Sequence, residues 1–207
     1  MDKRRLERRL SDLAGFESPR ADLEQYPTPA WLAAHLVHLA DLQGDVGDRT
    51  VVDLGTGTGI LALAATTRRP GGVLAVERDP GALAVARENE RAFDPPVAID
   101  WMLGDATRLP LKLRGATVLM NPPFGAQTGN EGADRAFLAT AAELAAVSYS
   151  IHNEGSWEFV ASFAGDNGGE VTQAFAAELA VDRQFEFHDS DREELPVEVF
   201  RIEWGGA

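Results

Sequence analysis

The stretch TVVDLGTGTGI, residues 50–60, decides how this chain folds. It opens with a short apolar run, which is typical of a buried strand. Glycines then occupy the alternate positions 55, 57 and 59, and a run with helical character follows from Ile60. A turn between a strand and a helix lies at the carboxyl edge of a parallel sheet, where ligands bind, and glycines let the backbone approach a ligand closely. The stretch therefore predicts an α/β domain with a ligand site at this turn.

Strand and helix patterns alternate along the rest of the chain. The sequence predicts helices over residues 1–10, 30–42, 60–67, 80–92, 133–146 and 156–164, and strands over residues 50–55, 72–79, 97–103, 116–121, 147–152, 171–181 and 196–204. Thr28 is expected to cap the second of these helices. Such alternation predicts a mostly parallel seven-stranded sheet with helices on both faces. No clear helix separates the last two strands, so we expect them to form an antiparallel hairpin at one edge.

Composition excludes several classes of protein. The chain has no cysteine, which rules out disulfides, zinc sites built from thiolates and thiol nucleophiles, and no other metal site is predicted. No apolar run approaches the length of a membrane span, and the first residues lack the apolar stretch of a secretory signal. We therefore expect a cytoplasmic protein with no membrane contact.

The charge of the chain is strongly acidic. Asp and Glu number 33 against 19 Lys and Arg, for a net charge of −14, and only Lys3 and Lys112 are lysines. Such a surface is tolerated in a salt-adapted cytoplasm, where salt screens the repulsion between carboxylates. It also argues against a nucleic-acid partner, because phosphate binding favours a basic surface. Residues 1–10 are the exception, with five basic and two acidic residues, and are the predicted contact to phosphate.

Three carboxylates are expected close to the glycine-rich turn. Asp53 ends the first strand, Glu77 lies near the end of the second about twenty residues after the turn, and Asp105 follows the third. A carboxylate in the place of Glu77 accepts hydrogen bonds from ribose hydroxyls, and one in the place of Asp105 can bind an adenine amino group. A dinucleotide site would require glycine at position 60, where the chain has Ile60. The pattern instead favours S-adenosylmethionine as the cofactor.

The motif Asn121-Pro122-Pro123-Phe124 ends the fourth strand. Two consecutive prolines stiffen the turn, so that the Asn121 side-chain oxygen and the Pro122 carbonyl can both accept hydrogen bonds from one planar NH2 group. These bonds would localise the nitrogen lone pair for attack on the sulfonium methyl, while Phe124 stacks on the flat substrate. The motif therefore predicts methylation of an amino group. The glycine-rich loop over residues 125–134 follows directly and could close over the substrate.

The chain resembles a known family along most of its length. The motifs that carry the resemblance are LEQYPTP (23–29), DLGTGTG (53–59), MNPPFG (120–125), AFL (136–138) and YSIH (149–152). Together they resemble the small-subunit ribosomal RNA adenine-N6 methyltransferases of the methyltransferase-like protein 5 family. The acidic composition would fit a salt-adapted archaeal member. The resemblance implies a Rossmann-like class I S-adenosylmethionine-dependent methyltransferase fold, with a basic helical segment over residues 1–22 and a single methyltransferase domain over residues 23–207.

The resemblance also implies roles for particular residues and a partner. Asn121, Pro122, Pro123 and Phe124 would be catalytic, and the cofactor would be bound by Gln25, Tyr26, Thr28, Asp53, Gly55, Thr58, Gly59, Glu77, Asp105 and Ala106. The substrate would be an adenosine in small-subunit rRNA. Members of this family pair with a small zinc-binding activator subunit, whose strand would join the edge strand over residues Val97–Leu103 to form a heterodimer.

The residues leave other functions open. Guanine-N2 rRNA methyltransferases and release-factor glutamine-N5 methyltransferases share the Asn-Pro-Pro-aromatic motif, because an amide and an exocyclic amine present the same NH2 geometry. A ribosome assembly factor that binds the cofactor without transferring its methyl group is a non-enzymatic alternative. A nicotinamide dehydrogenase is disfavoured by Ile60 and by the lack of a recognisable hydride-transfer residue.

Overall fold

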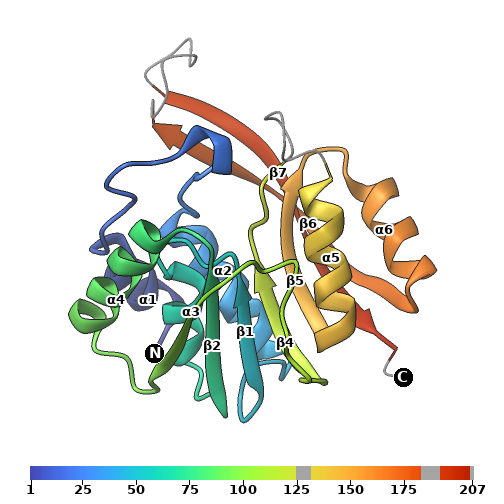
Figure 1. Cartoon of the computed structure of the whole chain (residues 1–207), viewed down its shortest axis with the longest axis horizontal. Coiled ribbons are helices and arrows are strands. Elements are labelled where there is room, and N and C mark those ends of the chain that lie inside the picture. Colours follow the sequence, from blue (N-terminus) through green and yellow to red (C-terminus); the bar gives the residue numbers. More distant parts are fainter. Residues whose placement is uncertain (125–131, 183–191, 206–207) are drawn as a thin grey trace.

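The computed structural model describes residues 1–124, 132–182 and 192–205. Within them, seven strands form one sheet in the order β3-β2-β1-β4-β5-β7-β6 (Figure 1). The strands are β1 (Thr50–Leu54), β2 (Gly72–Glu77), β3 (Ile99–Leu103), β4 (Ala116–Met120), β5 (Ala145–Asn153), β6 (Gly169–Asp182) and β7 (Arg192–Trp204). The first five in this order are parallel, while β7 runs antiparallel to both β5 and β6. The predicted fold, including the antiparallel terminal hairpin, is confirmed.

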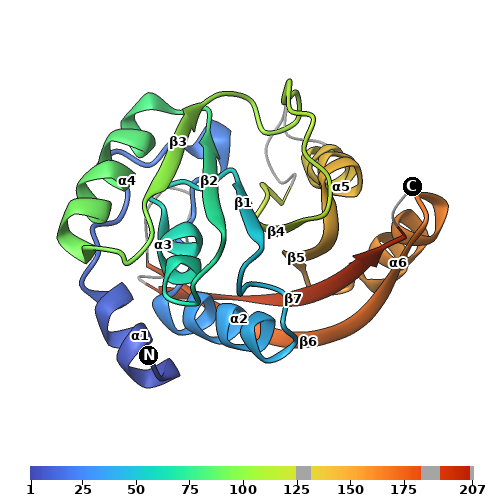
Figure 2. The ribbon, with the colours of Figure 1, turned by 90° about the horizontal axis from the view of Figure 1, so that it is seen from below.

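Helices cover both faces of the sheet (Figures 1 and 2). They are α1 (Lys3–Ser11), α2 (Ala30–Leu42), α3 (Ile60–Thr66), α4 (Pro80–Phe93), α5 (Ala133–Leu144) and α6 (Trp157–Asp166), with a short 3-10 turn, η1 (Ala21–Leu23). One core cluster joins buried residues of α1, α2 and α3 to the sheet, and a second joins those of α5 and α6 to its other face. Because both faces are covered, central strands such as β1 and β4 are buried along almost their whole length.

Helix α2 begins in a different way from the sequence prediction. Pro29 occupies the N-cap position with φ −61° and ψ 144°, and no side chain caps the helix. Thr28 is therefore one residue too early to be the cap. Its Oγ1 instead accepts a hydrogen bond from Nδ2 of Asn121 at 3.0 Å. The prediction that Thr28 caps α2 is wrong, because the fixed φ of proline lets Pro29 start the helix and leaves the threonine hydroxyl for a long-range contact.

The basic N-terminal helix α1 is packed into the protein. Leu6 and Leu10 are buried in the core cluster shared with α2 and α3, whereas Arg4, Arg5 and Arg8 are exposed. The chain that follows α1 is held by the Asn89 side chain of α4, which accepts a hydrogen bond from the Ala14 amide and donates to the Ala14 carbonyl, each at 2.9 Å. The boundary predicted between residues 22 and 23 stays a prediction.

The three glycines of the β1–α3 turn all adopt left-handed conformations. Gly55, Gly57 and Gly59 have φ of +68°, +57° and +89°. Each also lies against an aromatic ring, so that an added Cβ would come within 3.0 Å of Phe137 at Gly55, 2.9 Å of Phe16 at Gly57 and 2.8 Å of Trp101 at Gly59. Both the backbone angles and the close rings therefore require glycine at alternate positions.

The substitution Gly59→Ala is expected to destabilise the protein by about 2–4 kcal/mol, through left-handed strain and overpacking against Trp101. That ring cannot move away freely, because Trp101 Nε1 donates to Glu90 Oε2 at 2.6 Å. Urea unfolding measures the loss. Gly165→Ala in α6 is the matched control: an added Cβ there meets open space, so we expect a gain of about 0.5–1 kcal/mol. Equal effects of the two substitutions would contradict this account of the turn.

Candidate active site

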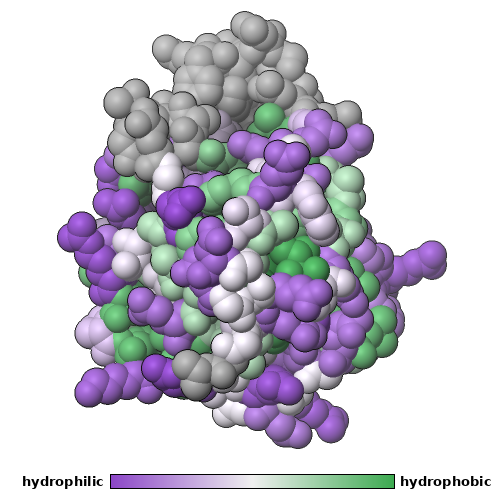
Figure 3. All heavy atoms as spheres, turned by 90° about the vertical axis from the view of Figure 1, so that its right-hand side faces the viewer, coloured by the Kyte–Doolittle hydropathy of each residue, from purple (hydrophilic) through white to green (hydrophobic). Residues whose placement is uncertain are grey.

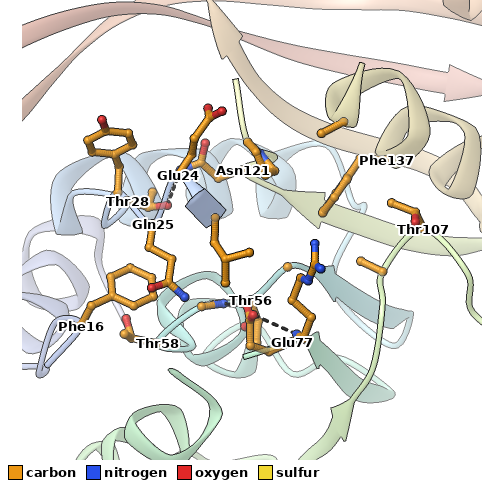
Figure 4. A pocket seen from close by; sticks show the side chains of 18 of the residues that line it. Phe16, Glu24, Gln25, Thr28, Thr56, Thr58, Glu77, Thr107, Asn121 and Phe137 are labelled. Atoms are coloured by element: carbon orange, nitrogen blue, oxygen red, sulfur yellow. Dashed lines mark hydrogen bonds between the residues drawn. The ribbon is translucent and has the colours of Figure 1, made fainter. Parts of the chain in front are cut away.

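A pocket of about 300 Å³ lies at the carboxyl ends of the parallel strands (Figure 4). It is lined by Phe16, Leu23, Glu24, Gln25, Tyr26, Pro27, Thr28, Gly55, Thr56, Gly57, Thr58, Ile60, Glu77, Arg78, Asp105, Ala106, Thr107, Asn121, Pro123, Gly132, Ala133, Ala136 and Phe137. These residues come from the glycine-rich turn, the ends of β2, β3 and β4, the segment before α2 and the start of α5. The topology thus brings together residues that are far apart in the sequence, at the edge where α/β sheets bind ligands.

Glu77 joins the end of β2 to the glycine-rich turn. Its Oε1 accepts hydrogen bonds from the amides of Arg78 and Asp79, and its Oε2 accepts one from the amide of Gly57, each at 2.8 Å. Burial raises the pKa of the Glu77 carboxyl, and these three amides oppose that rise. The carboxylate is therefore fixed at the floor of the pocket with lone pairs available to a ligand.

Asp53 lies beneath the turn and does not line the pocket. Its Oδ2 accepts hydrogen bonds from Thr56 Oγ1 at 2.6 Å and from the Ala62 amide at 2.9 Å, while its buried Oδ1 has no hydrogen-bond partner. The side chain is only 1% exposed, and burial raises its pKa to about 7. Asp53 thus ties the turn to α3. Neither Asp53 nor Gly59 lines the pocket. The roles in cofactor binding predicted for these two residues stay predictions.

The buried Asp53 carboxyl is expected to make stability depend on pH. The group has a pKa near 3.8 in the unfolded chain and about 7 in the folded one, so between these values the folded state binds the additional proton. Its contribution therefore favours folding at low pH and falls as the pH rises from about 4 to about 7. Urea unfolding between pH 5 and pH 8 should show wild type losing stability relative to Asp53→Asn, which keeps an acceptor for Thr56. Parallel profiles of the two proteins would contradict this.

Asp105 and Ala106 lie at the end of β3, on the pocket wall. Oδ1 of Asp105 accepts from the amide and the hydroxyl of Thr107, at 2.9 and 2.7 Å. Although desolvation alone would raise the pKa of Asp105, the bonds from Thr107 and the charges of Arg78 and Arg108 lower it. The side chain is therefore an ionised acceptor at the mouth of the pocket.

Gln25 holds the segment before α2 in place. Its Nε2 donates to Oδ2 of Asp79 at 2.7 Å, and its Oε1 accepts from the amide of Arg20 at 2.8 Å. Tyr26 and Thr28 follow on the same segment and also line the pocket. The segment thus forms one wall opposite the glycine-rich turn (Figure 4).

Asn121 is anchored through one half of its side-chain amide. Nδ2 donates to Thr28, while the buried Oδ1 has no hydrogen-bond partner. With the nitrogen on the Thr28 side, the amide presents its oxygen as an acceptor for a ligand. Pro123 lines the pocket, Pro122 is buried, and Phe124 packs against the core cluster of α1–α3. The arrangement can accept a hydrogen bond from an N–H donor brought into the pocket.

Several pocket residues were not identified from the sequence as site residues. Phe16 and Phe137 stand over Gly57 and Gly55, and Thr107 holds Asp105. Phe137 belongs to the AFL motif of the resemblance, which could have indicated it, whereas the sequence around Phe16 carries no such signal. Most of the loop predicted to close over the site, residues 125–134, lies outside the described residues.

Among residues 1–124, 132–182 and 192–205, no group of three or more His, Asp or Glu side chains could hold a metal ion. In the same part of the chain, no helix has the length and apolar character needed to cross a membrane.

Comparison with known proteins places this geometry in context. Residues 33–177 match the model of the methyltransferase small domain family. The chain is 33% identical to the rRNA N(6)-adenosine-methyltransferase Mettl5 of Drosophila melanogaster, over 98% of this chain and 96% of that one, and 31% identical to its counterpart in Danio rerio, over 98% and 99%. A crystal structure described as a putative RNA methyltransferase from Pyrococcus horikoshii superposes with a TM-score of 0.89 and 35% identity, covering 99% of this chain and 98% of that one.

Proposed function

The chain belongs to the methyltransferase small domain family and, within it, to the rRNA N6-adenosine methyltransferases of the methyltransferase-like protein 5 type, and we propose that it methylates the exocyclic N6 of an adenosine in small-subunit rRNA. The observation that carries the proposal is the buried, unpartnered Oδ1 of Asn121 at the end of β4. It lies in a pocket that also contains the glycine-rich turn and the carboxylates of Glu77 and Asp105. A methyl acceptor with an NH2 group fits such an acceptor atom.

The pocket residues fit S-adenosylmethionine. Gly55 and Gly57 line the pocket without a side chain of their own, Glu77 presents a fixed carboxylate for ribose hydroxyls, and Asp105 presents an acceptor for an adenine amino group. Gln25, Tyr26 and Thr28 form the wall from which the methionine end would be held. When bound, the cofactor supplies a methyl group already activated by the positive sulfonium.

The chain's own residues would then orient the nucleophile. Oδ1 of Asn121 and the carbonyl of Pro122 accept the two N–H groups of N6, which localises the nitrogen lone pair. The stiff Pro122-Pro123 turn keeps the acceptors in place. In this structure Phe124 packs against the core cluster of α1–α3 and does not line the pocket, so its proposed stacking on the base would require its ring to turn toward the substrate. As N6 forms its bond to the methyl carbon, the bond from that carbon to sulfur would break, and the nitrogen would carry a positive charge. Such a nitrogen is strongly acidic, because loss of a proton restores conjugation of its lone pair with the ring, so the proton would pass to solvent without a strong general base.

The experiment that tests the substrate class offers both candidate acceptors to one enzyme. Purified protein is incubated with radiolabelled S-adenosylmethionine and either small-subunit rRNA or a release factor, and the labelled nucleoside is identified by mass spectrometry. We expect N6-methyladenosine in the RNA. Label in guanine N2 or in a glutamine side chain would replace the proposal with the corresponding alternative. An absence of transfer together with tight cofactor binding would favour an assembly factor.

We further propose that a small zinc-binding activator subunit adds a strand to β3, as the family resemblance implies. In support, β3 is an edge strand in the described sheet, and its Leu103 is 59% exposed. Co-purification of the two chains, followed by hydrogen exchange, tests this. The amides of β3 should gain protection in the complex, while those of the other edge strand, β6, should not. Protection on β6 alone would contradict the proposed edge.

A further inference from the structure

The segment that joins β3 to β4 is unusual in so acidic a chain. Between Asp105 and Glu131 the sequence has no acidic residue, which is the longest such interval in the protein. Arg108, Lys112 and Arg114 fall within it, and Lys112 is one of only two lysines. Carboxylates are thus absent from the part of the connector that follows Asp105 and leads to β4 and the catalytic motif.

The structure gives this connector two distinct sides. Leu109, Leu111 and Leu113 are half-buried and pack against the core cluster of α5 and α6. The residues between and beside them are exposed, so that all three basic side chains are directed outward, and we call Arg108, Lys112 and Arg114 the basic ridge. Residues 109–114 belong to no helix or strand. Because a fully extended chain advances about 3.3 Å per residue, the ridge covers at most about 20 Å of surface.

The ridge begins at the pocket. Thr107 lines the pocket directly before Arg108, and the charge of Arg108 contributes to lowering the pKa of Asp105 at its mouth. From there the connector crosses the face of the sheet that α5 covers (Figures 1 and 2). On the described part of the side that carries α5 and α6, hydrophilic residues are interspersed with small groups of hydrophobic ones (Figure 3).

We propose that the basic ridge binds the phosphate backbone of the RNA strand that presents its adenosine to the pocket. This inference rests on the proposed function. The net charge of −14 repels RNA from most of the surface, so that affinity depends on stretches of chain that expose basic side chains and contain no acidic residue of their own. A single-stranded target with its base turned into the pocket leaves its backbone along the rim, where the ridge starts.

Helix α1 is the competing basic segment, and the structure separates it from the ridge. It packs on the face of the sheet covered by α2 and α3, whereas the connector packs with α5 and α6 on the other face. Its exposed Arg4, Arg5 and Arg8 carry the same charge as the ridge, which makes them a matched control. This assigns the phosphate contact to the connector, in place of the N-terminal segment favoured by net charge alone.

The test compares two triple variants, Arg108→Gln/Lys112→Gln/Arg114→Gln and Arg4→Gln/Arg5→Gln/Arg8→Gln. Binding of a fluorescent single-stranded oligonucleotide of small-subunit rRNA sequence that contains adenosine is measured by anisotropy over a series of salt concentrations. The ridge variant should lose at least about tenfold in affinity, and its slope of log K against log salt should fall by about 2, because each phosphate contact on single strands contributes about 0.7. The α1 variant should stay within about twofold of wild type.

The second part of the test measures KM and kcat for RNA, affinity for S-adenosylhomocysteine, and binding of a release factor. In the ridge variant KM for RNA should rise, while kcat at saturating RNA and affinity for S-adenosylhomocysteine remain at wild-type values. An equal or larger loss in the α1 variant, or wild-type binding by the ridge variant, would overturn the inference. Ridge-dependent RNA binding by a wild-type protein that transfers no methyl group would contradict the proposed function and leave the ridge supported. Binding of a release factor through the ridge, without RNA binding, would overturn both.

Discussion

The substitution Asn121→Ala is expected to lower kcat for methyl transfer to rRNA by about 10²–10³-fold, the size of effect seen when one polar group aimed at a reacting atom is removed. The change deletes the unpartnered Oδ1, which we propose accepts a hydrogen bond from the substrate amine. Affinity for S-adenosylhomocysteine should stay within about threefold, because the glycine-rich turn and Glu77 are untouched. Single-turnover rates and calorimetric binding measure the two quantities. An unchanged rate would contradict the proposed role of Asn121.

Thr28 provides the control for that prediction, since its hydroxyl accepts the hydrogen bond from Nδ2 of Asn121 at 3.0 Å. Thr28→Val should lower the rate by about tenfold, the value of one hydrogen bond, and Thr28→Ser should restore most of it. If Thr28 acts through Asn121, adding Thr28→Val to Asn121→Ala should cause no further loss in kcat. Additive losses would show that Thr28 acts independently, for example by holding the cofactor alone.

The sequence was sufficient to predict the fold because its signals are local. Short apolar strands alternate with amphipathic helices, and the observed ends of α2 match the predicted ones at both residues, 30 and 42. Once the sheet is parallel, Glu77, Asp105 and Asn121 must meet at one edge, because each ends or follows a strand. Their convergence in the pocket therefore follows from topology.

The long-range contacts that support the site could not be predicted from local sequence patterns. The hydrogen bond between Thr28 and Asn121 joins positions far apart in the chain, and no local pattern indicates it. The prediction that Thr28 caps α2 was wrong because Pro29 occupies the N-cap position. Phe16 reaches Gly57 only because α1 packs on α2 and the following segment crosses the turn. Asp53 has the motif position of a cofactor residue, yet its side chain lies beneath the turn. The position of a residue in a motif does not by itself show whether its side chain lines the pocket or holds the residues that do.

The substitution Glu77→Gln is expected to weaken binding of S-adenosylhomocysteine by about 100-fold or more, equivalent to about 2.7 kcal/mol. In the free protein both carboxylate oxygens already accept hydrogen bonds, from the amides of Gly57, Arg78 and Asp79. An amide NH2 in place of one oxygen would face a backbone N–H instead of accepting from it. The change therefore disturbs the turn and also removes the charge-assisted acceptor for the ribose.

The matched control for this prediction is Glu88→Gln, which removes the same charge from an exposed position on α4. Affinity of that variant for S-adenosylhomocysteine should remain at the wild-type value, since long-range repulsion is screened by salt. At saturating cofactor, Glu77→Gln should recover most of the wild-type kcat, because Asn121 and Thr28 keep their geometry on β4 and the opposite wall. A loss confined to KM would separate Glu77, which holds the cofactor, from Asn121, which acts on the amine. A fall in kcat as large as that of Asn121→Ala would mean instead that disturbing the glycine-rich turn also displaces Asn121 and the catalytic motif.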